Sequence, residues 1–169
     1  PNVDEGELKK ELCFDLNTFA PLRISNLCKL KNINYIHISS GCVYTGYGKK
    51  YTEEDTPNFG FFDEESSTYS KSKHAFELGC DWGLILRVRM PFCNILHERS
   101  FITKSYKYDN LIDRVNSKTY IPHLLDFIEH FIHKGYEAKD KEILNFVNPN
   151  ALSTKKVTEV MKSFDVVNP

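Results

Sequence analysis

The chain has 169 residues, and its 22 Lys and Arg against 23 Asp and Glu give a net charge of -1. Apolar residues make up 41% and charged residues 27%, which is typical of a globular domain. No apolar run approaches the roughly 20 residues of a membrane span, and the balanced charge provides no global attraction to nucleic acid or to an anionic membrane. We therefore expect a soluble, folded protein that recognises its ligand locally.

The cysteine pattern predicts a cytoplasmic protein. Five cysteines are an odd number, and no Cys-x-x-Cys pair occurs, which argues against a secreted disulfide framework. No signal stretch opens the chain, which begins with Pro1-Asn2-Val3-Asp4 and has the character of an internal segment. His130 and His133 are the one close histidine pair, and without a cysteine ligand or a third partner they predict no metal site.

Hydrophobic periodicity predicts a chain in which helices alternate with strands. The first helix contains Pro21, which lacks the N–H that would bond the carbonyl of Asn17, so we expect a kink there. The predicted helices cover 7–30, 69–79, 101–108, 122–134 and, capped by Ser153, 153–164, and the predicted strands cover 33–39, 83–88 (ended by Pro91), 111–115 and 143–147. The alternation predicts an α/β fold with a mainly parallel sheet.

A Tyr-x-x-x-Lys pair at Tyr69 and Lys73 is the strongest candidate for chemistry. Residues four apart on a helix share one face, and a nearby ammonium favours the phenolate, which makes Tyr69 a plausible general acid. Such a pair alone is expected about once by chance, and its other interpretation is a solvated helix face. Ser40, directly after a predicted strand, could hydrogen-bond a substrate carbonyl beside Tyr69, and Asn17 lies at the kink.

This ordered Asn, Ser, Tyr and Lys set resembles the extended branch of the short-chain dehydrogenase/reductase superfamily. A narrower resemblance is to the bifunctional UDP-4-keto-6-deoxy-glucose 3,5-epimerase/4-reductases that make UDP-L-rhamnose. The motifs that carry it are Pro1-Asn2-Val3-Asp4, Ser40-Gly41-Cys42-Val43-Tyr44, Glu53-Glu54-Asp55-Thr56-Pro57-Asn58-Phe59, Tyr69-Ser70-Lys71-Ser72-Lys73, Leu86-Arg87-Val88-Arg89-Met90-Pro91, Phe101-Ile102-Thr103-Lys104 and Asn145-Phe146-Val147-Asn148-Pro149.

The resemblance implies a Rossmann-like, doubly wound parallel sheet with a small C-terminal substrate-binding lobe. Residues 1–91 would be the remainder of the NADP-binding domain and 92–169 mainly the lobe, with one strand returning to the sheet. The chain has no Gly-rich phosphate turn. We therefore expect it to be the C-terminal portion of the fold, with roughly 70 residues of the first βαβ units preceding Pro1.

The resemblance also implies epimerisation at C3 and C5 followed by reduction at C4 with NADPH, with NADH as the alternative. Arg87 and Arg89 alternate with apolar residues, and the other interpretation for one of them is a buried ion-pair partner. The implied site residues are Ser40, Tyr69, Lys73, Cys42, Lys104 and Asn17 for catalysis, Tyr69, Lys73, Arg89 and Pro91 for the cofactor, and Ser40, Gly41, Cys42 and Asn94 for the nucleotide-sugar substrate.

Two alternatives stay open at this point. One is a 4-reductase of the dTDP-4-dehydrorhamnose type, which Cys42 and Lys104 would distinguish from the bifunctional enzyme. The other is a non-catalytic regulatory subunit that binds a sugar nucleotide or NADP. The resemblance further implies a homodimer formed through the helices that carry Asn17 and Tyr69.

Overall fold

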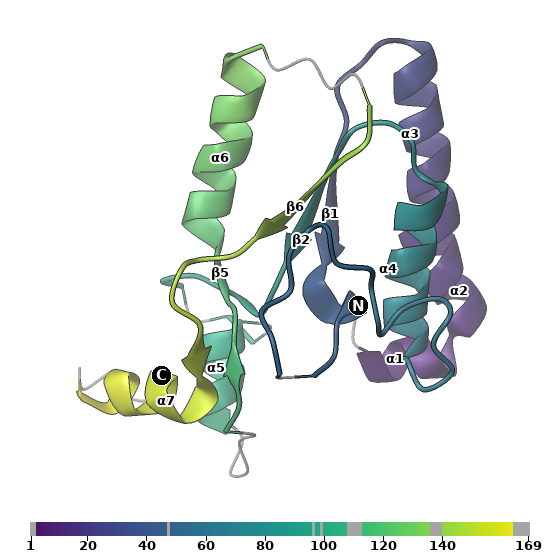
Figure 1. Cartoon of the computed structure of the whole chain (residues 1–169). Coiled ribbons are helices and arrows are strands. Elements are labelled where there is room, and N and C mark those ends of the chain that lie inside the picture. The colour runs from purple at the N-terminus through teal and green to yellow at the C-terminus, as the bar shows by residue number, and fades with distance from the viewer. Residues whose placement is uncertain are drawn as a thin grey trace. The chain divides into compact units, whose positions relative to one another are not determined.

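The computed structural model describes residues 3–46, 48–95, 97–98, 100–107, 113–135 and 140–163. The chain forms two compact units. Unit 1 contains Pro1–Arg87 and Ile132–Asn145, and unit 2 contains Val88–Phe131 and Phe146–Pro169. Figure 1 labels the main elements of both.

Unit 1 is built on a three-stranded parallel sheet of order β1-β2-β6. These strands are β1 (Ile36–Ser40), β2 (Leu84–Val88) and β6 (Glu142–Phe146). The pairing begins where the Leu84 amide donates to the Tyr35 carbonyl at 2.8 Å and the Glu142 amide donates to the Gly83 carbonyl at 3.0 Å. The predicted α/β fold with a parallel sheet is thus confirmed, and all three strands lie within one or a few residues of their predicted positions.

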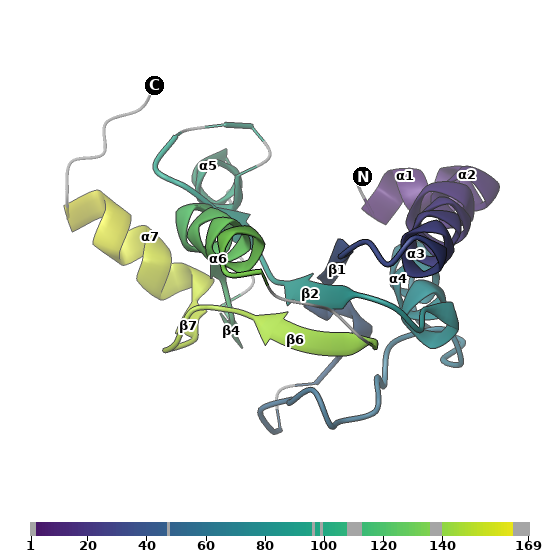
Figure 2. The ribbon, with the colours of Figure 1, turned by 90° about the horizontal axis from the view of Figure 1, so that it is seen from above.

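The helices of unit 1 lie beside the edge of the sheet that β1 forms, as Figures 1 and 2 show. The last of them, α4, follows a long loop, and its first turn is capped by Ser67, whose hydroxyl accepts from the Ser70 amide at 3.1 Å. The helical elements of unit 1 are α1 (Val3–Leu8), α2 (Lys10–Phe14), the π-helical turn η1 (Asp15–Phe19), α3 (Ala20–Leu30), the 3-10 turn η2 (Gly41–Val43) and α4 (Thr68–Gly79).

The expected kink before Pro21 takes the form of the π-helical turn η1. The Ala20 amide donates to the carbonyl of Asp15, five residues back, so one extra residue is accommodated in the helix. Pro21 then lies in the first turn of α3, where a missing N–H is tolerated. The helical segment also begins earlier than predicted, at Val3, and is interrupted at Lys9.

The core of unit 1 lies between α4 and β2. Phe76 and Ile85 are fully buried together with Cys80, and Leu22, Tyr35 and Ile143 pack against them. The apolar run of β2 is buried from Leu84 to Arg87, as expected of a strand covered on both faces.

Unit 2 combines short strands with three helices: β3 (Pro91–Phe92), α5 (Phe101–Lys107), β4 (Val115–Asn116), β5 (Thr119–Tyr120), α6 (Ile121–His133), whose last two residues belong to unit 1, β7 (Leu152–Ser153) and α7 (Thr154–Ser163). β3 pairs with β5 in parallel, and β4 pairs with β7 in antiparallel. Thr119, which is fully buried, donates its hydroxyl to the Phe146 carbonyl at 2.6 Å.

The secondary structure of unit 2 departs from the prediction in three places. Pro91 begins strand β3 rather than only ending β2. The strand expected over 111–115 is found at Val115–Asn116, with 111 and 112 outside the described residues, and β5 and β7 were not predicted. Strands of two residues are too short for a periodicity to reveal. Among the described residues, no helix is both long and apolar enough to cross a membrane.

Candidate functional site

The first part of the site lies where β1 ends. Ser40 is the last residue of the strand, and its hydroxyl accepts the Cys42 amide at 3.2 Å, which caps the short turn η2 that holds Gly41 and Cys42. Cys42 is half-buried. The Ser70 hydroxyl of α4 donates to the Cys42 carbonyl at 3.0 Å, so this turn is bonded directly to the helix.

The second part is the face of α4 that carries Tyr69 and Lys73. Tyr69 lies in the first turn and is half-buried, while Lys73, one turn later, is 9% exposed. The Lys73 ammonium donates to the carbonyl of Ile38 in β1 at 3.3 Å. The bonds from Lys73 to Ile38 and from Ser70 to Cys42 therefore join α4, which carries Tyr69 and Lys73, to the end of β1 that carries Ser40.

Burial controls the ionisation of this region. It lowers the pKa of Lys73, while the Glu77 carboxylate and Cys13 oppose that change. Burial, helped by the charge of Lys73, lowers the pKa of His37 to about 3. His37 is therefore neutral near pH 7, and it adds no second positive charge beside Lys73.

Asn17 lies on η1 and is buried against α4. Its side-chain amide donates to the Cys13 sulfur at 3.3 Å, and the neighbouring Thr18 hydroxyl donates to the Ser72 carbonyl at 2.7 Å. The π-helical turn thus places Asn17 beside the helix that carries Tyr69 and Lys73.

The remaining predicted site residues belong to unit 2. Arg89 donates from Nε to the Asn116 side chain at 3.0 Å, and its backbone amide donates to the Thr119 hydroxyl at 3.0 Å. Pro91 is exposed in β3, and Lys104 is exposed on α5. Asn94 accepts a hydrogen bond from the Tyr120 hydroxyl at 2.8 Å.

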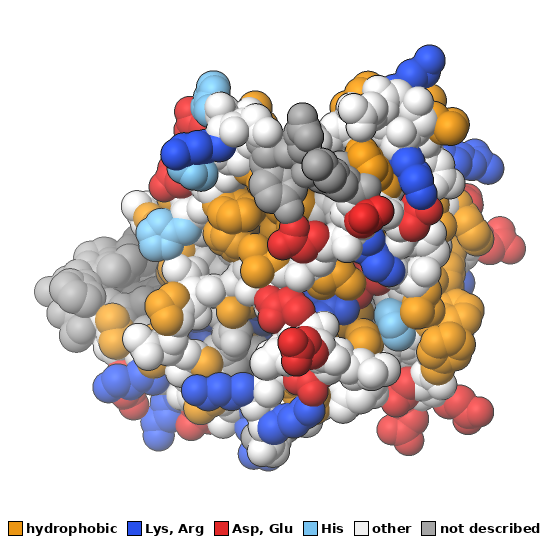
Figure 3. Space-filling model, turned by 45° about the horizontal axis from the view of Figure 1, so that its top comes forward, with side chains coloured by type: hydrophobic (Ala, Val, Ile, Leu, Met, Phe, Trp, Pro, Cys, Tyr) orange, Lys and Arg blue, Asp and Glu red, His pale blue; other side chains and the backbone are white. Residues whose placement is uncertain are grey.

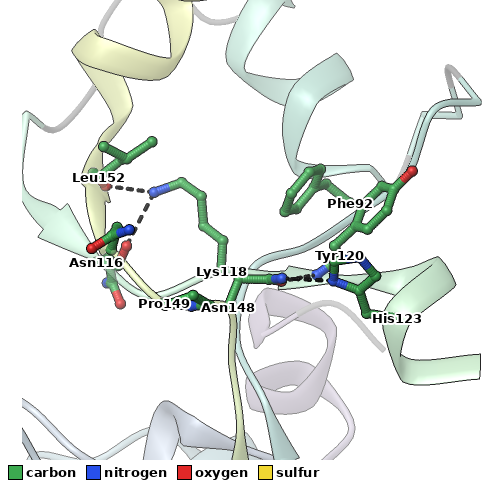
Figure 4. Close-up of a pocket in the computed structure, with 9 residues that line it drawn as sticks. Phe92, Asn116, Lys118, Tyr120, His123, Asn148, Pro149 and Leu152 are labelled. Carbon is green, nitrogen blue, oxygen red and sulfur yellow. Dashed lines mark hydrogen bonds between the residues drawn. The ribbon is translucent and has the colours of Figure 1, made fainter. Parts of the chain in front are cut away.

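Unit 2 also contains a pocket of about 360 Å³, shown in Figure 4. One wall is aromatic: the rings of Phe92 and Tyr120 lie 5.2 Å apart, and His123 meets Tyr120 edge to face at 4.9 Å. On the other side lies Lys118, 8% exposed, whose ammonium donates to the carbonyls of Asn116 and Leu152. The pocket therefore combines an aromatic wall with a buried cation.

Sequence reasoning missed most of the polar side chains behind the site. Glu77 and Arg87 form a buried ion pair, and Ser39 and Tyr44 bond to it. A charge inside the apolar run of β2 was the available signal, and it supported a buried ion pair for one of the two arginines of this segment. Arg87 is that residue, and its partner could not be identified from spacing because it lies on another element.

The parallel sheet, flanked by helices and carrying its polar residues just beyond the end of β1, is a Rossmann-like α/β fold. Residues 1–82 match the model of the NAD dependent epimerase/dehydratase family. The solved structure of the UDP-rhamnose synthase from Acanthamoeba polyphaga mimivirus superposes with a TM-score of 0.73 and 26% identity, over 87% of this chain and 52% of that one.

A second solved structure shows the same fold. The hypothetical dTDP-4-dehydrorhamnose reductase from Sulfolobus tokodaii has a TM-score of 0.76 at 22% identity, covering 97% of this chain and 58% of its own.

Curated relatives from Arabidopsis thaliana are enzymes of rhamnose synthesis. The bifunctional dTDP-4-dehydrorhamnose 3,5-epimerase/dTDP-4-dehydrorhamnose reductase is 29% identical over 174 residues, which cover 97% of this chain and 55% of the relative. A trifunctional UDP-glucose 4,6-dehydratase/UDP-4-keto-6-deoxy-D-glucose 3,5-epimerase/UDP-4-keto-L-rhamnose-reductase is 31% identical over 180 residues, which cover 100% of this chain and 25% of the relative. The chain thus spans about half of the first and a quarter of the second.

Proposed function

We propose that this chain carries the catalytic residues of an NADPH-dependent enzyme that converts UDP-4-keto-6-deoxy-glucose to UDP-L-rhamnose by 3,5-epimerisation and 4-keto reduction. The observation that carries the proposal is the group formed by Ser40, Tyr69 and Lys73, with the Lys73 ammonium bonded to β1 one turn along α4 from Tyr69. The relatives named above support the substrate class.

In the reduction, Ser40 orients the C4 carbonyl and Tyr69 donates a proton to its oxygen. The carbonyl oxygen gains negative charge as hydride arrives, so a positioned O–H stabilises the transition state. Lys73, one turn along α4, presents its positive charge on the same helix face as the Tyr69 phenol.

The residues present fit a nicotinamide cofactor. An ammonium has three N–H donors, and one of those of Lys73 goes to the Ile38 carbonyl, which leaves capacity for the ribose hydroxyls of the cofactor. NADPH, or alternatively NADH, supplies the hydride when bound. By resemblance, Tyr69, Arg89 and Pro91 would also hold it.

In the epimerisation, the resemblance assigns proton removal to Cys42 and proton return to Lys104. A thiolate can remove the proton from a carbon next to a ketone, and an ammonium can return a proton to that carbon. Asn17 completes the proposed catalytic set.

By resemblance, we assign the nucleotide-sugar substrate to Ser40, Gly41, Cys42 and Asn94. The pocket of unit 2 supports the assignment of Asn94, because the aromatic wall of the pocket includes Tyr120, which bonds to Asn94. Residues 1–91 would then belong to the cofactor domain and 92–169 mainly to the substrate lobe. We further propose a cytoplasmic homodimer.

A 4-reductase without epimerase activity is the second candidate. The group of Ser40, Tyr69 and Lys73 favours it as well, because a 4-keto reduction needs a proton donor and no base for a ring carbon. Cys42 separates the two candidates, because a reductase alone needs no base at C3 and C5.

The test is to incubate the full-length protein with UDP-4-keto-6-deoxy-glucose and NADPH and to follow cofactor oxidation, solvent deuterium uptake and product stereochemistry. We expect Tyr69→Phe to abolish NADPH oxidation while deuterium still exchanges, and Cys42→Ala to abolish the exchange. Loss of a general acid typically costs about 100-fold or more in rate.

Cys93→Ala is the matched control, because Cys93, like Cys42, is half-buried and in no disulfide but lies in unit 2. If Cys42→Ala exchanged deuterium at the wild-type rate, the assignment of Cys42 as the base would be wrong. If the wild type exchanged no deuterium but reduced a 4-keto sugar nucleotide with NADPH, the epimerase assignment would be wrong and the 4-reductase would stand. If a folded wild-type protein neither oxidised NADPH nor exchanged deuterium, and also failed to reduce a 4-keto-rhamnose nucleotide that is already epimerised, both enzymatic candidates would be rejected in favour of a non-catalytic binder.

A further inference from the structure

A buried ion pair connects α4 to β2 directly behind the proposed catalytic residues. Glu77 and Arg87 are each 3% exposed, and Arg87 Nη2 donates to Glu77 Oε2 at 2.6 Å. Arg87 Nε lies 3.1 Å from both carboxylate oxygens. The pair therefore has the multidentate geometry of a strong charge-assisted interaction.

Two further side chains extend this pair to the turn that holds the proposed site. Ser39, on β1, donates its hydroxyl to Glu77 Oε1 at 2.7 Å. Arg87 Nη1 donates to the Tyr44 hydroxyl at 2.6 Å, and Tyr44 in turn donates to the Asp55 carbonyl at 2.9 Å. We call Ser39, Glu77, Arg87 and Tyr44 the Glu77 network.

Stability alone gives a weak reason for such a network. Two charges removed from water lose hydration energy comparable to their mutual attraction, and well-packed apolar residues often stabilise a protein equally well. What apolar residues cannot supply is direction, because hydrogen bonds fix the relative orientation of the groups that they join.

The four residues lie close in sequence to the proposed catalytic residues, so the orientation that they fix is that of the proposed site. Ser39 is adjacent to Ser40, and Tyr44 is two residues after Cys42. Glu77 is one helical turn after Lys73, on the α4 face that also carries Tyr69.

We infer that Ser39, Glu77, Arg87 and Tyr44 are positioning residues that hold Ser40 and Cys42 in fixed geometry against Tyr69 and Lys73. The inference rests on the proposed function for its catalytic consequence. The Glu77 network has two arms, which serve different steps. Ser39 orients the end of β1 for carbonyl reduction, and Tyr44 holds the Cys42 turn for epimerisation.

The test removes one hydroxyl from each arm and leaves the buried ion pair intact. Tyr44→Phe deletes the acceptor of Arg87 Nη1, and Tyr35→Phe is its matched control, since Tyr35 is also half-buried and hydrogen-bonded but lies just before β1. Ser39→Ala is matched by Ser25→Ala, a buried serine whose hydroxyl bonds the Trp82 carbonyl.

We expect Tyr44→Phe to lower kcat for deuterium exchange about tenfold and Ser39→Ala to lower kcat for NADPH oxidation about tenfold, each with KM unchanged. Each control variant should keep the wild-type kcat even where its Tm falls as much as that of the variant it matches, or more. If each variant and its control had equal kcat values, the inference would be overturned. A residue with a merely structural role would change kcat only as far as it changes Tm.

A second readout needs no turnover: the rate of Cys42 alkylation by iodoacetamide, followed by peptide mass spectrometry with Cys93 as the internal reference. Releasing the turn should raise the Cys42 rate about tenfold in Tyr44→Phe and leave it unchanged in Tyr35→Phe. If the wild type shows no turnover, the proposed function fails, and the alkylation rate of Cys42 relative to that of Cys93 decides alone. A rise of this ratio in Tyr44→Phe supports positioning by Tyr44, and an unchanged ratio overturns it.

Discussion

At the scale of single residues, buried polar side chains determine the chemistry of unit 1. Lys73 keeps its ammonium in a buried site because the Ile38 carbonyl solvates it and Glu77 provides negative charge nearby. His37 lies on the same side of β1, with its ring 3.9 Å from that of Phe76. Its Nε2 is buried and has no hydrogen-bond partner among the described residues, so protonation there is costly.

This arrangement predicts acid-sensitive stability. The pKa of His37 is about 3 when folded and near 6.5 when unfolded, so the unfolded state binds more protons between these values. The free energy of unfolding should fall as pH drops through that window, by about 2 to 3 kcal/mol between about pH 7 and about pH 4.5.

Urea unfolding at the two pH values measures this change. His37→Gln should remove most of the difference, whereas His123→Gln, at an exposed histidine of unit 2, should leave it intact. An undiminished pH dependence in His37→Gln would show that other groups cause it.

At the scale of elements, the connections are as specific as the helices and strands. The π-helical turn η1 lets the helix continue into α3 despite Pro21, and it places Asn17 against α4. Gly83, just before β2, has a φ of +102°, and a Cβ there would lie 2.6 Å from the Tyr35 carbonyl oxygen. That oxygen is also the acceptor of the first β1–β2 hydrogen bond, from Leu84.

Gly83→Ala should therefore destabilise the protein by about 2 to 5 kcal/mol, because backbone strain and steric overlap add. Gly135→Ala provides the comparison: its φ is +64°, but among the described residues beyond its chain neighbours no atom lies within 4 Å of the position that an added methyl group would take, so only about 1 kcal/mol should be lost. Chemical denaturation of both variants measures the difference, and equal losses would contradict the steric part of this explanation.

At the scale of the whole molecule, unit 1 exposes an apolar surface along its N-terminal helices. Apolar side chains follow one another along the right-hand edge of Figure 3. From α2 to α3 the exposed members are Leu12, Leu16, Phe19, Ile24, Leu27 and Leu30, with exposures from 49% to 81%. An apolar surface of this extent on a folded domain is typical of a protein interface.

If the proposed homodimer uses this surface, the full-length protein should have twice its monomer mass by light scattering. Leu16→Arg should shift it toward monomer, because burying an unpaired charge at an interface costs several kcal/mol. Ile132→Arg, at a residue of α6 that is 65% exposed, is the control and should leave the mass unchanged. A monomeric wild type would reject the homodimer.

Several features of the protein were readable from local pattern. The α/β class, the strand before Ser40 and the helix that brings Tyr69 and Lys73 to one face depend on periodicities of two and 3.6 residues, which neighbouring residues define. A kink near Asn17 followed from the missing N–H of Pro21, although its π-helical form did not.

Other features were decided only by the tertiary structure, because they depend on elements distant in sequence. The Glu77–Arg87 pair joins a helix to a strand, and the aromatic wall of the unit 2 pocket joins β3 to the start of α6. The sequence by itself determined the main helices and strands of unit 1 and indicated the side chains that we propose to carry chemistry. Packing decided which buried charges meet, because a desolvated ion finds its partner across space and no local rule of spacing identifies that partner.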